Sequence, residues 1–136
     1  MQSEPMTFTA SELEYLAAQP LGRLATVQPD GTLQVSPVGF TWNPETATID
    51  IRGFSMAASR KFRNVAANGR VAFVVDDLPS TDPWRVRCLE IRGDGEAVDG
   101  PEAIIRIHPR RVISFGIGET DTEPHRLTVS KRDVSA

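Results

Sequence analysis

The sequence predicts a mainly β protein, a small barrel of six or seven short antiparallel strands with two short helices. Apolar and polar residues alternate over several short segments, and turn residues recur between them about every eight to twelve positions. Helical spacing of apolar residues occurs in only two stretches. With 136 residues, 40% of them hydrophobic, the chain has the length and composition of one ordinary domain.

The first expected element is a short helix. Thr9 and Glu12 have the spacing of a capping box, with Thr9 as N-cap and Glu12 as the third helical residue. Pro20 ends the pattern. The apolar residues that fall on one face of this helix are Leu13, Leu16 and Ala17.

A β-meander is expected next. Residues 21–28 alternate as a strand, and the turn at residues 29–31 returns the chain as a second strand over residues 32–42. Residues 47–52 form the third strand. The order up to this point is therefore helix, strand, strand, strand.

The pattern of residues 49–76 indicates strand, loop, helix and strand. We expect the helix over residues 57–68, ended by Gly69, and a strand buried on both faces over residues 70–76. The predicted buried stripe of the helix is Phe62, Val65 and Ala66.

The second half of the chain reads as strands separated by breaks. Residues 78–84 contain two prolines and are expected as a surface loop. The following elements are a strand over residues 85–92, a turn or bulge at 93–95, a resumed strand at 96–98 and a β segment over 103–116 with a bulge or corner at Pro109. We expect one domain over residues 1–118 and a loosely held tail over residues 119–136.

A single barrel of this size would leave apolar strand surface uncovered. The residues expected there are Phe40, Trp42, Phe73 and Trp84. A homodimer would cover this surface, because a second copy removes the same apolar patch from water on both chains.

Composition excludes several classes of function. The net charge is −3 and the basic residues are not gathered into long runs, so neither nucleic acid nor a membrane surface is an expected partner. Cys88 is the only cysteine, and His108 and His125 lie far apart, so no metal site is expected. Neither a leader pattern nor a long apolar run is visible, which predicts a cytoplasmic protein.

Two cations occupy the predicted start of the second helix. A helix N-terminus carries roughly half a positive charge, so Arg60 and Lys61 are unfavourable there unless an anion is present. A bound phosphate would accept hydrogen bonds from the backbone, from the Ser59 hydroxyl and from Arg60. The alternative is that both side chains are solvated, with their stems over Phe62 or Phe54.

Pro37 interrupts the second predicted strand. Because proline has no N–H to donate, the strand is either an edge or a bulge, or a place where something other than a strand faces the backbone. Both interpretations stay open at this stage.

Three segments in register resemble the pyridoxamine phosphate oxidase-like split β-barrel superfamily, whose members carry flavin or deazaflavin. The segments are residues 59–61, 87–93 and 108–116, and the resemblance spans about residues 8–117. The last two segments are most similar to the short actinobacterial branch that uses coenzyme F420.

The resemblance implies a split-barrel homodimer with the cofactor at the interface. Ser59, Arg60 and Lys61 would hold its phosphate, and Phe54 and Ser55 would line its chain or ring. The remaining implied cofactor residues are Ser36, Pro37 and Val38 at the ring and Asn64 at the tail. Trp84 or Arg85 would reach across from the second subunit or belong to the core or rim.

Two departures separate this chain from the pyridoxamine phosphate oxidases. Ser36 stands where those enzymes have an arginine, and their C-terminal Trp/Arg segment is absent. Both departures favour coenzyme F420 over FMN. The resemblance thus implies an F420-dependent reductase of a conjugated small molecule such as an enone or quinone, for which no catalytic side chain is assigned.

Three alternatives remain open. They are an FMN-dependent oxidoreductase, a carrier of flavin, F420 or haem without turnover, and a structural dimer with solvated cations. Cys88 is expected in the strand core, and His108 would be the one plausible axial ligand for haem.

Overall fold

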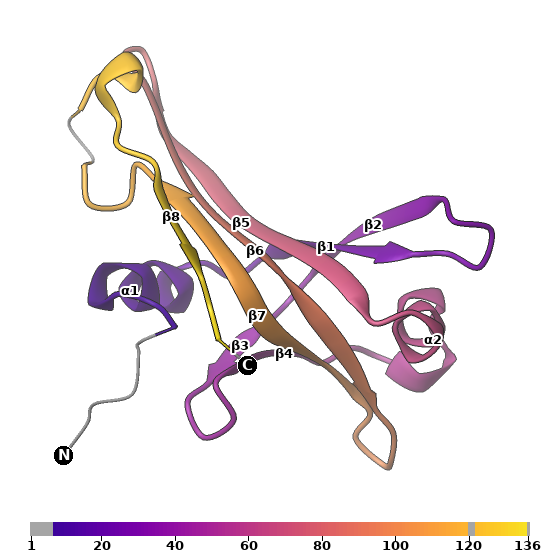
Figure 1. Cartoon of the computed structure of the whole chain (residues 1–136). Coiled ribbons are helices and arrows are strands. Elements are labelled where there is room, and N and C mark those ends of the chain that lie inside the picture. Colours follow the sequence, from indigo (N-terminus) through magenta and orange to yellow (C-terminus); the bar gives the residue numbers. More distant parts are fainter. Residues whose placement is uncertain (1–6, 120–121, 136) are drawn as a thin grey trace, which may run out of the picture.

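The computed structural model describes residues 7–119 and 122–135 and has the expected mainly β architecture (Figure 1). Its helices are α1 (Ala10–Ala18) and α2 (Arg60–Ala67), with 3₁₀ turns at Met56–Ala58 and Pro124–Arg126. The strands are β1 (Gly22–Val27), β2 (Leu33–Val38), β3 (Thr41–Asn43), β4 (Thr48–Ile51), β5 (Arg70–Thr81), β6 (Trp84–Val98), β7 (Ile104–Phe115) and β8 (Ser130–Asp133). No helix among the described residues is long and apolar enough to cross a membrane.

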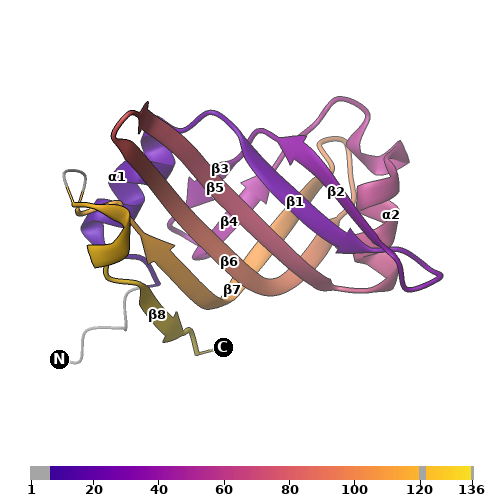
Figure 2. The ribbon, with the colours of Figure 1, turned by 90° about the horizontal axis from the view of Figure 1, so that it is seen from above.

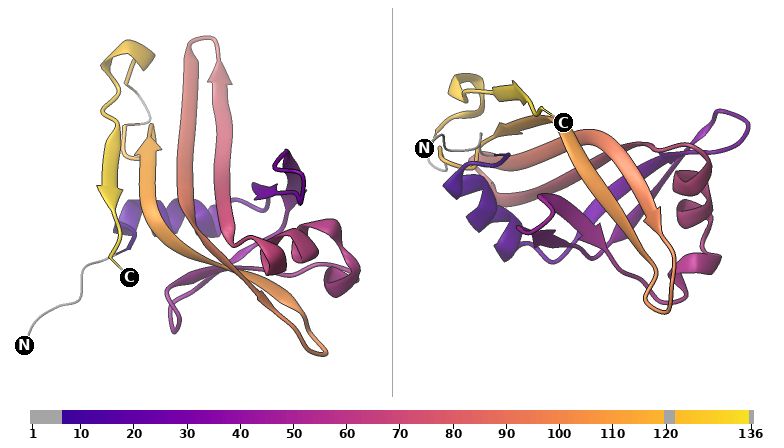
Figure 3. Two further views of the ribbon diagram at one scale, coloured as in Figure 1. Left: turned by 45° about the vertical axis from the view of Figure 1, so that its right-hand side comes forward. Right: turned by 60° about the horizontal axis from the view of Figure 1, so that its bottom comes forward.

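The eight strands form one antiparallel sheet, one strand more than the upper end of the expected range. Their order is β2-β1-β5-β6-β7-β4-β3, and β8 pairs with β7 outside this path. Strands β2 and β3 follow each other in the chain but stand at opposite ends of the order, so the sheet curls round on itself (Figure 3). Helix α1 lies at one end of the curled sheet and α2 at the other (Figure 2).

The interior of the curl is the hydrophobic core. Every second residue of β1 is buried, as the alternating sequence predicts. Phe73 is 1% exposed and meets Phe40 edge to face, with ring centroids 5.3 Å apart. A Cβ at Gly22 would lie 2.3 Å from the Phe73 ring, so this glycine makes room for the ring.

The first helix has the predicted cap. The Glu12 backbone N–H donates to the Thr9 hydroxyl, and the Thr9 N–H donates to the Glu12 carboxylate. Within α1, however, Ala17 is exposed, so the predicted face was wrong at that position. Leu16 is buried as predicted, and Tyr15 is buried as well.

The second helix is shorter than predicted. A 3₁₀ turn and Ser59 precede α2, which therefore begins at Arg60 and not at residue 57. Phe62 and Val65 are buried as predicted, but Ala66 is exposed and Asn64 is buried. The prediction of a purely apolar buried face on α2 was wrong, because the polar side chain of Asn64 packs against the sheet.

The predicted second strand divides into two. Residues 39 and 40 separate β2, which pairs with β1, from β3, which pairs with β4. The expected surface loop at residues 78–84 was wrong, because β5 and β6 continue as a long hairpin that projects beyond the rest of the sheet. Leu78 and Pro79 fall in a register shift, so the proline removes no ladder hydrogen bond there.

The bulge predicted near Pro109 is confirmed. Arg92 pairs with Arg111 and Gly93 pairs with Pro109, so Arg110 is an extra residue in β7. A Cβ at Gly93 would lie 2.2 Å from the His108 carbonyl oxygen, which explains the glycine. Strand β6 runs through this bulge without a turn.

The expectation of a loose C-terminal tail was wrong for residues 130–133. This segment is β8, which pairs with β7. Arg132 donates to the Thr7 carbonyl and forms an ion pair with Glu12. Burial alone would raise the pKa of Glu12, but hydrogen bonds from Arg132, Ser114 and the Thr9 backbone outweigh burial and lower it.

Candidate functional site

Strand β2 is an open edge of the sheet, since it pairs only with β1 in the described part of the chain. At the β1–β2 turn the Gln28 N–H donates to the Thr32 carbonyl, 2.8 Å away. Because bonded and unbonded pairs alternate in an antiparallel ladder, Ser36 and Val38 bond to β1 through their backbones. Val35 and Pro37 direct their backbone groups toward the open edge instead.

This alternation assigns different roles to the three predicted ring contacts. Pro37 presents a carbonyl oxygen and no N–H at the open edge, consistent with the edge-strand interpretation. Val38 is buried, and its backbone is used by β1. Val35 was missed by the sequence analysis, although its N–H and carbonyl face the edge and its side chain is 67% exposed. Counting positions from the turn at Gly31 could have found it.

Ser36 has a feature that the ladder does not explain. Its hydroxyl oxygen is buried and has no hydrogen-bond partner among the described residues. An unpaired buried hydroxyl costs free energy unless a ligand or water completes it. Ser36 therefore has an unused polar group beside the open edge.

The start of α2 is built as the sequence predicted, with one difference. Ser59 is the N-cap: its hydroxyl accepts from the Phe62 N–H and donates to the Met56 carbonyl, 2.6 Å away. The hydroxyl is thus already used within the chain. The remaining donors at this helix end are the backbone N–H groups of Arg60 and Lys61.

The side chains of Arg60 and Lys61 have no ion-pair or hydrogen-bond partner among the described residues. Arginines that pair with carboxylates include Arg23, Arg87, Arg92, Arg106, Arg110, Arg111 and Arg132. Hydrogen bonds from Thr32 lower the pKa of Asp30, and the charge of Arg60 adds a smaller effect. The α2 start therefore carries two cations without an ion pair among the described residues, and the Asp30 carboxylate of the β1–β2 turn offsets the charge of Arg60 only in part.

Asn64 lies inside the protein, on the face of α2 turned to the sheet. It is 3% exposed, and its amide nitrogen donates to Thr26 and to Gln34, both at 3.1 Å. These bonds bring α2 against β1 and β2. They give Asn64 a structural role, and its contact with the cofactor tail stays a prediction of the resemblance.

The loop between β4 and α2 is exposed. Phe54 is fully exposed, and Ser55 has a left-handed backbone with φ of 53°. A cavity of about 480 Å³ lies between this loop and the β6–β7 turn. Its lining residues are Arg52, Gly53, Ser55, Met56, Ala57 and residues 100–103.

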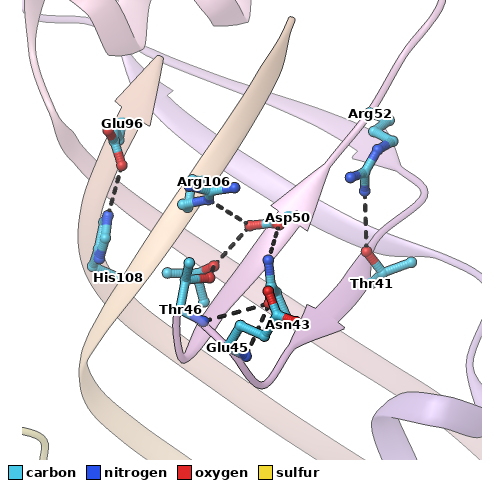
Figure 4. Close-up of polar contacts among 10 residues, drawn as sticks. Thr41, Asn43, Glu45, Thr46, Asp50, Arg52, Glu96, Arg106 and His108 are labelled. Carbon is cyan, nitrogen blue, oxygen red and sulfur yellow. Dashed lines mark hydrogen bonds and ion pairs between the residues drawn. The ribbon is translucent and has the colours of Figure 1, made fainter. Parts of the chain in front are cut away.

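Asp50, near the end of β4 and just before this loop, has a buried carboxylate (Figure 4). Asp50 is 1% exposed and accepts hydrogen bonds from Asn43, Thr48 and Arg106 at 2.9, 2.7 and 3.1 Å. Burial alone would raise its pKa, but these three bonds lower it, so Asp50 is ionised near neutral pH. Such a group orders the strands and does not donate a proton.

The histidines and the cysteine offer little chemistry. His108 Nε2 lies 3.0 Å from a Glu96 carboxylate oxygen on the sheet surface (Figure 4). Burial, with Asp76 and Glu90 nearby, raises the pKa of the Cys88 thiol to about 11, which opposes thiolate reactivity. The described residues contain no group of three or more His, Cys, Asp or Glu side chains that could hold a metal ion.

Residues 8–129 match the family model described as pyridoxamine 5′-phosphate oxidase. The chain belongs to the pyridoxamine 5′-phosphate oxidase family. The curled sheet and its open β2 edge are thus the split barrel of this family, as the sequence predicted.

Proteins similar to this chain are named for different functions. The 5a,11a-dehydrotetracycline/5a,11a-dehydrooxytetracycline reductase of Streptomyces rimosus is 45% identical over 94% of this chain and 97% of its own length. A solved structure named F420 reductase is 28% identical, with a TM-score of 0.54, over 78% of this chain and 95% of the other. A heme binding protein from Mycobacterium smegmatis shares the fold with a TM-score of 0.66 at 14% identity, over 92% of this chain and 59% of the other.

Proposed function

We propose that this protein is a coenzyme F420-dependent reductase that transfers hydride from the reduced deazaflavin to a conjugated small molecule such as an enone or quinone. The observation that carries the proposal is the pair of cations at the start of α2, where the side chains of Arg60 and Lys61 form no ion pair or hydrogen bond among the described residues. A chain of net charge −3 has carboxylates available for pairing, so leaving these two cations unpaired favours an anionic ligand.

The residues present fit a phosphate-bearing flavin-type cofactor. Arg60, Lys61 and their backbone N–H groups would hold the phosphate. The ring edge would lie along β2, where Val35 offers a donor and an acceptor, Pro37 offers an acceptor, and the Ser36 hydroxyl has no partner. Phe54 and Ser55 would line the chain or ring.

Coenzyme F420 is favoured over FMN by two observations. The structure named F420 reductase supports a deazaflavin, and the relative at 45% identity supports a reductase. Ser36 also stands where the resemblance to the flavin-dependent oxidases leads us to expect an arginine. FMN remains the second candidate, since the family takes its name from a flavin-type oxidase.

The reductant belongs to the cofactor. When bound, reduced F420 would supply a hydride and water a proton for reduction of a conjugated double bond. The contribution of the chain is to hold the phosphate and align the ring edge on β2. This division of work is consistent with the absence of a nucleophile and base pair near the site in the described residues.

A second copy of the chain would complete the site. The outer side of β2, β1 and β5 carries an apolar face, which we define by Leu33, Val35, Ala25, Ala72 and Val74. Leu33 and Val35 are 73% and 67% exposed. A cavity of about 270 Å³ lies over β1 on this face, and the charged residues Arg23 and Glu90 also line it. We propose that this face is the homodimer interface.

Three of the four residues predicted on the uncovered surface lie in the core or pack against it. Phe73 is core, and Phe40 and Trp42 pack against the core. Trp84 alone of the four residues is mostly exposed, at 52%, on the long β5–β6 hairpin. It is the residue best placed to reach a second subunit.

The haem-carrier alternative has less support. The likeness to the heme binding protein is at 14% identity and concerns the fold alone. His108 already bonds Glu96 through Nε2, so an axial role through that nitrogen would require breaking the contact.

The direct test is anaerobic reduction of menadione, a neutral quinone, by the purified protein. Reduced F420 should support turnover, and NADPH with FMN should not. Turnover only with NADPH and FMN would show an FMN-dependent oxidoreductase instead. Turnover with neither donor would overturn the reductase proposal.

A further inference from the structure

Arg52 follows the last residue of β4, and its side chain is exposed. One guanidinium nitrogen donates to the Thr41 hydroxyl at 3.3 Å (Figure 4). In the described ranges no carboxylate lies within ion-pair distance of it. The guanidinium has five N–H donors, so most of them remain for a ligand.

The nearest acid on the same strand does not neutralise Arg52. Asp50 accepts from Thr48 and Arg106 on one oxygen and from Asn43 on the other. Its charge is therefore balanced by Arg106, and its side chain is out of solvent reach. This arrangement orders the strand and leaves the charge of Arg52 free.

Arg52 lines a small cavity of about 190 Å³. The other lining residues are Gly39, Phe40, Thr41 and Asp50. A Cβ built at Gly39 meets no atom within 4 Å, so the cavity is open on that side. Sites for whole drug-sized ligands are larger, at roughly 300–1,000 Å³, so this space suits one substituent of a ligand.

The cavity adjoins both segments that we assign to the cofactor. Gly39 directly follows Ser36–Val38, and Arg52 lies two residues before Phe54. Arg60 and Lys61, the candidate phosphate contacts, do not line this cavity. Arg52 also lines the larger cavity beside Ser55 and Ala57, so it stands between the two spaces.

We infer that Arg52 binds an anionic oxygen of the substrate, so that the site selects conjugated compounds bearing a carboxylate, sulfonate or ionised enol. The inference rests on the proposed function. A substrate anion in the cavity would meet a guanidinium that can bond it through two donors. Neutral analogues would lose this contact and keep the rest of the site.

A matched pair of quinones tests the inference, namely 1,4-naphthoquinone-2-sulfonate and neutral menadione. Arg52→Gln should raise KM for the sulfonate about tenfold and leave kcat within twofold. For menadione, KM and kcat of Arg52→Gln should both stay within twofold of the values for the unaltered protein. Arg52→Lys should recover part of the loss, and Arg63→Gln, which removes an exposed cation from α2, should change neither substrate.

Binding without turnover separates this inference from the proposed reductase activity. Quenching of the Trp42 and Trp84 fluorescence by the sulfonate should show about tenfold weaker binding to Arg52→Gln than to the unaltered protein. Weaker binding in the absence of turnover would support Arg52 and overturn the reductase. Equal effects of Arg52→Gln on both quinones, or no effect on the sulfonate, would overturn the role of Arg52.

Discussion

Pro37 lies opposite Arg23 in a pair whose backbone groups do not bond each other. The nitrogen of Pro37 points to the open edge of β2, so the proline leaves no gap in the β1–β2 ladder. An edge proline and a ligand-facing proline are therefore compatible at this position.

Replacing Pro37 by alanine should alter the site more than the fold. Pro37→Ala adds an N–H at the edge and should change the free energy of unfolding by less than about 1 kcal/mol. We expect a change of several-fold in cofactor affinity or turnover. Pro29→Ala in the β1–β2 turn is the control, with a similar small effect on stability and none on the cofactor. A loss confined to stability would leave only the edge-strand interpretation.

Lys61 provides the clearest test of the phosphate contact. Lys61→Ala should weaken cofactor binding by about 1.5–3 kcal/mol, roughly 10- to 150-fold, because a charge-assisted contact is lost. The melting temperature should change little, since Lys61 has no ion-pair partner among the described residues. Arg63→Ala on the same helix should leave affinity unchanged. Equal affinity of Lys61→Ala and the unaltered protein would reject the phosphate assignment.

The apolar face predicts the oligomeric state. Val35→Glu places a charge in this face and should convert a dimer into a monomer at micromolar concentration, measured by sedimentation. Val129→Glu, at an exposed position outside the face, should leave the dimer intact. A monomeric unaltered protein would contradict the proposed interface.

Glu12 should make stability depend on acid pH. Its pKa in the folded protein lies below the ordinary value of 4.5, so its contribution is present above that pH and is lost as the pH falls through the lower folded pKa. Glu12→Gln should lower stability by about 1–3 kcal/mol at neutral pH. The difference from the unaltered protein should shrink below about pH 4.5.

Glu14→Gln supplies the matched control for this experiment, since Glu14 is exposed on the same helix. Its stability should stay within about 0.5 kcal/mol of the unaltered protein at every pH. A constant difference between Glu12→Gln and the unaltered protein across the acid range would contradict the role of the Glu12–Arg132 pair.

Local signals in the sequence were sufficient for most of the fold. The capping box at Thr9, the turn at residues 29–31 and the bulge at Pro109 each depend on chemistry within a few residues. The β5–β6 hairpin was missed because Pro79 reads as a loop signal, and only the register shift in the partner strand makes it tolerable. Strand β8 was missed because Arg132 and Glu12 are 120 residues apart.

The candidate site was predictable only where its residues carry a local sequence signal. Arg60 and Lys61 could be found from charge at a helix start. Asn64 was predicted only as a contact to the cofactor tail, because its partners on β1 and β2 are not visible in the local pattern. Val35 has the sequence pattern of an ordinary strand residue. Its backbone faces the open edge only because hydrogen-bonded and unbonded pairs alternate along the β1–β2 ladder.

The central claim is best tested by titrating the purified protein with coenzyme F420 and, separately, with FMN, while following the fluorescence of Trp42 and Trp84. We expect tight binding of F420 and weak binding of FMN. Tight binding of FMN with weak binding of F420 would contradict the deazaflavin assignment, and binding of neither would leave a split barrel whose Arg60 and Lys61 are only solvated.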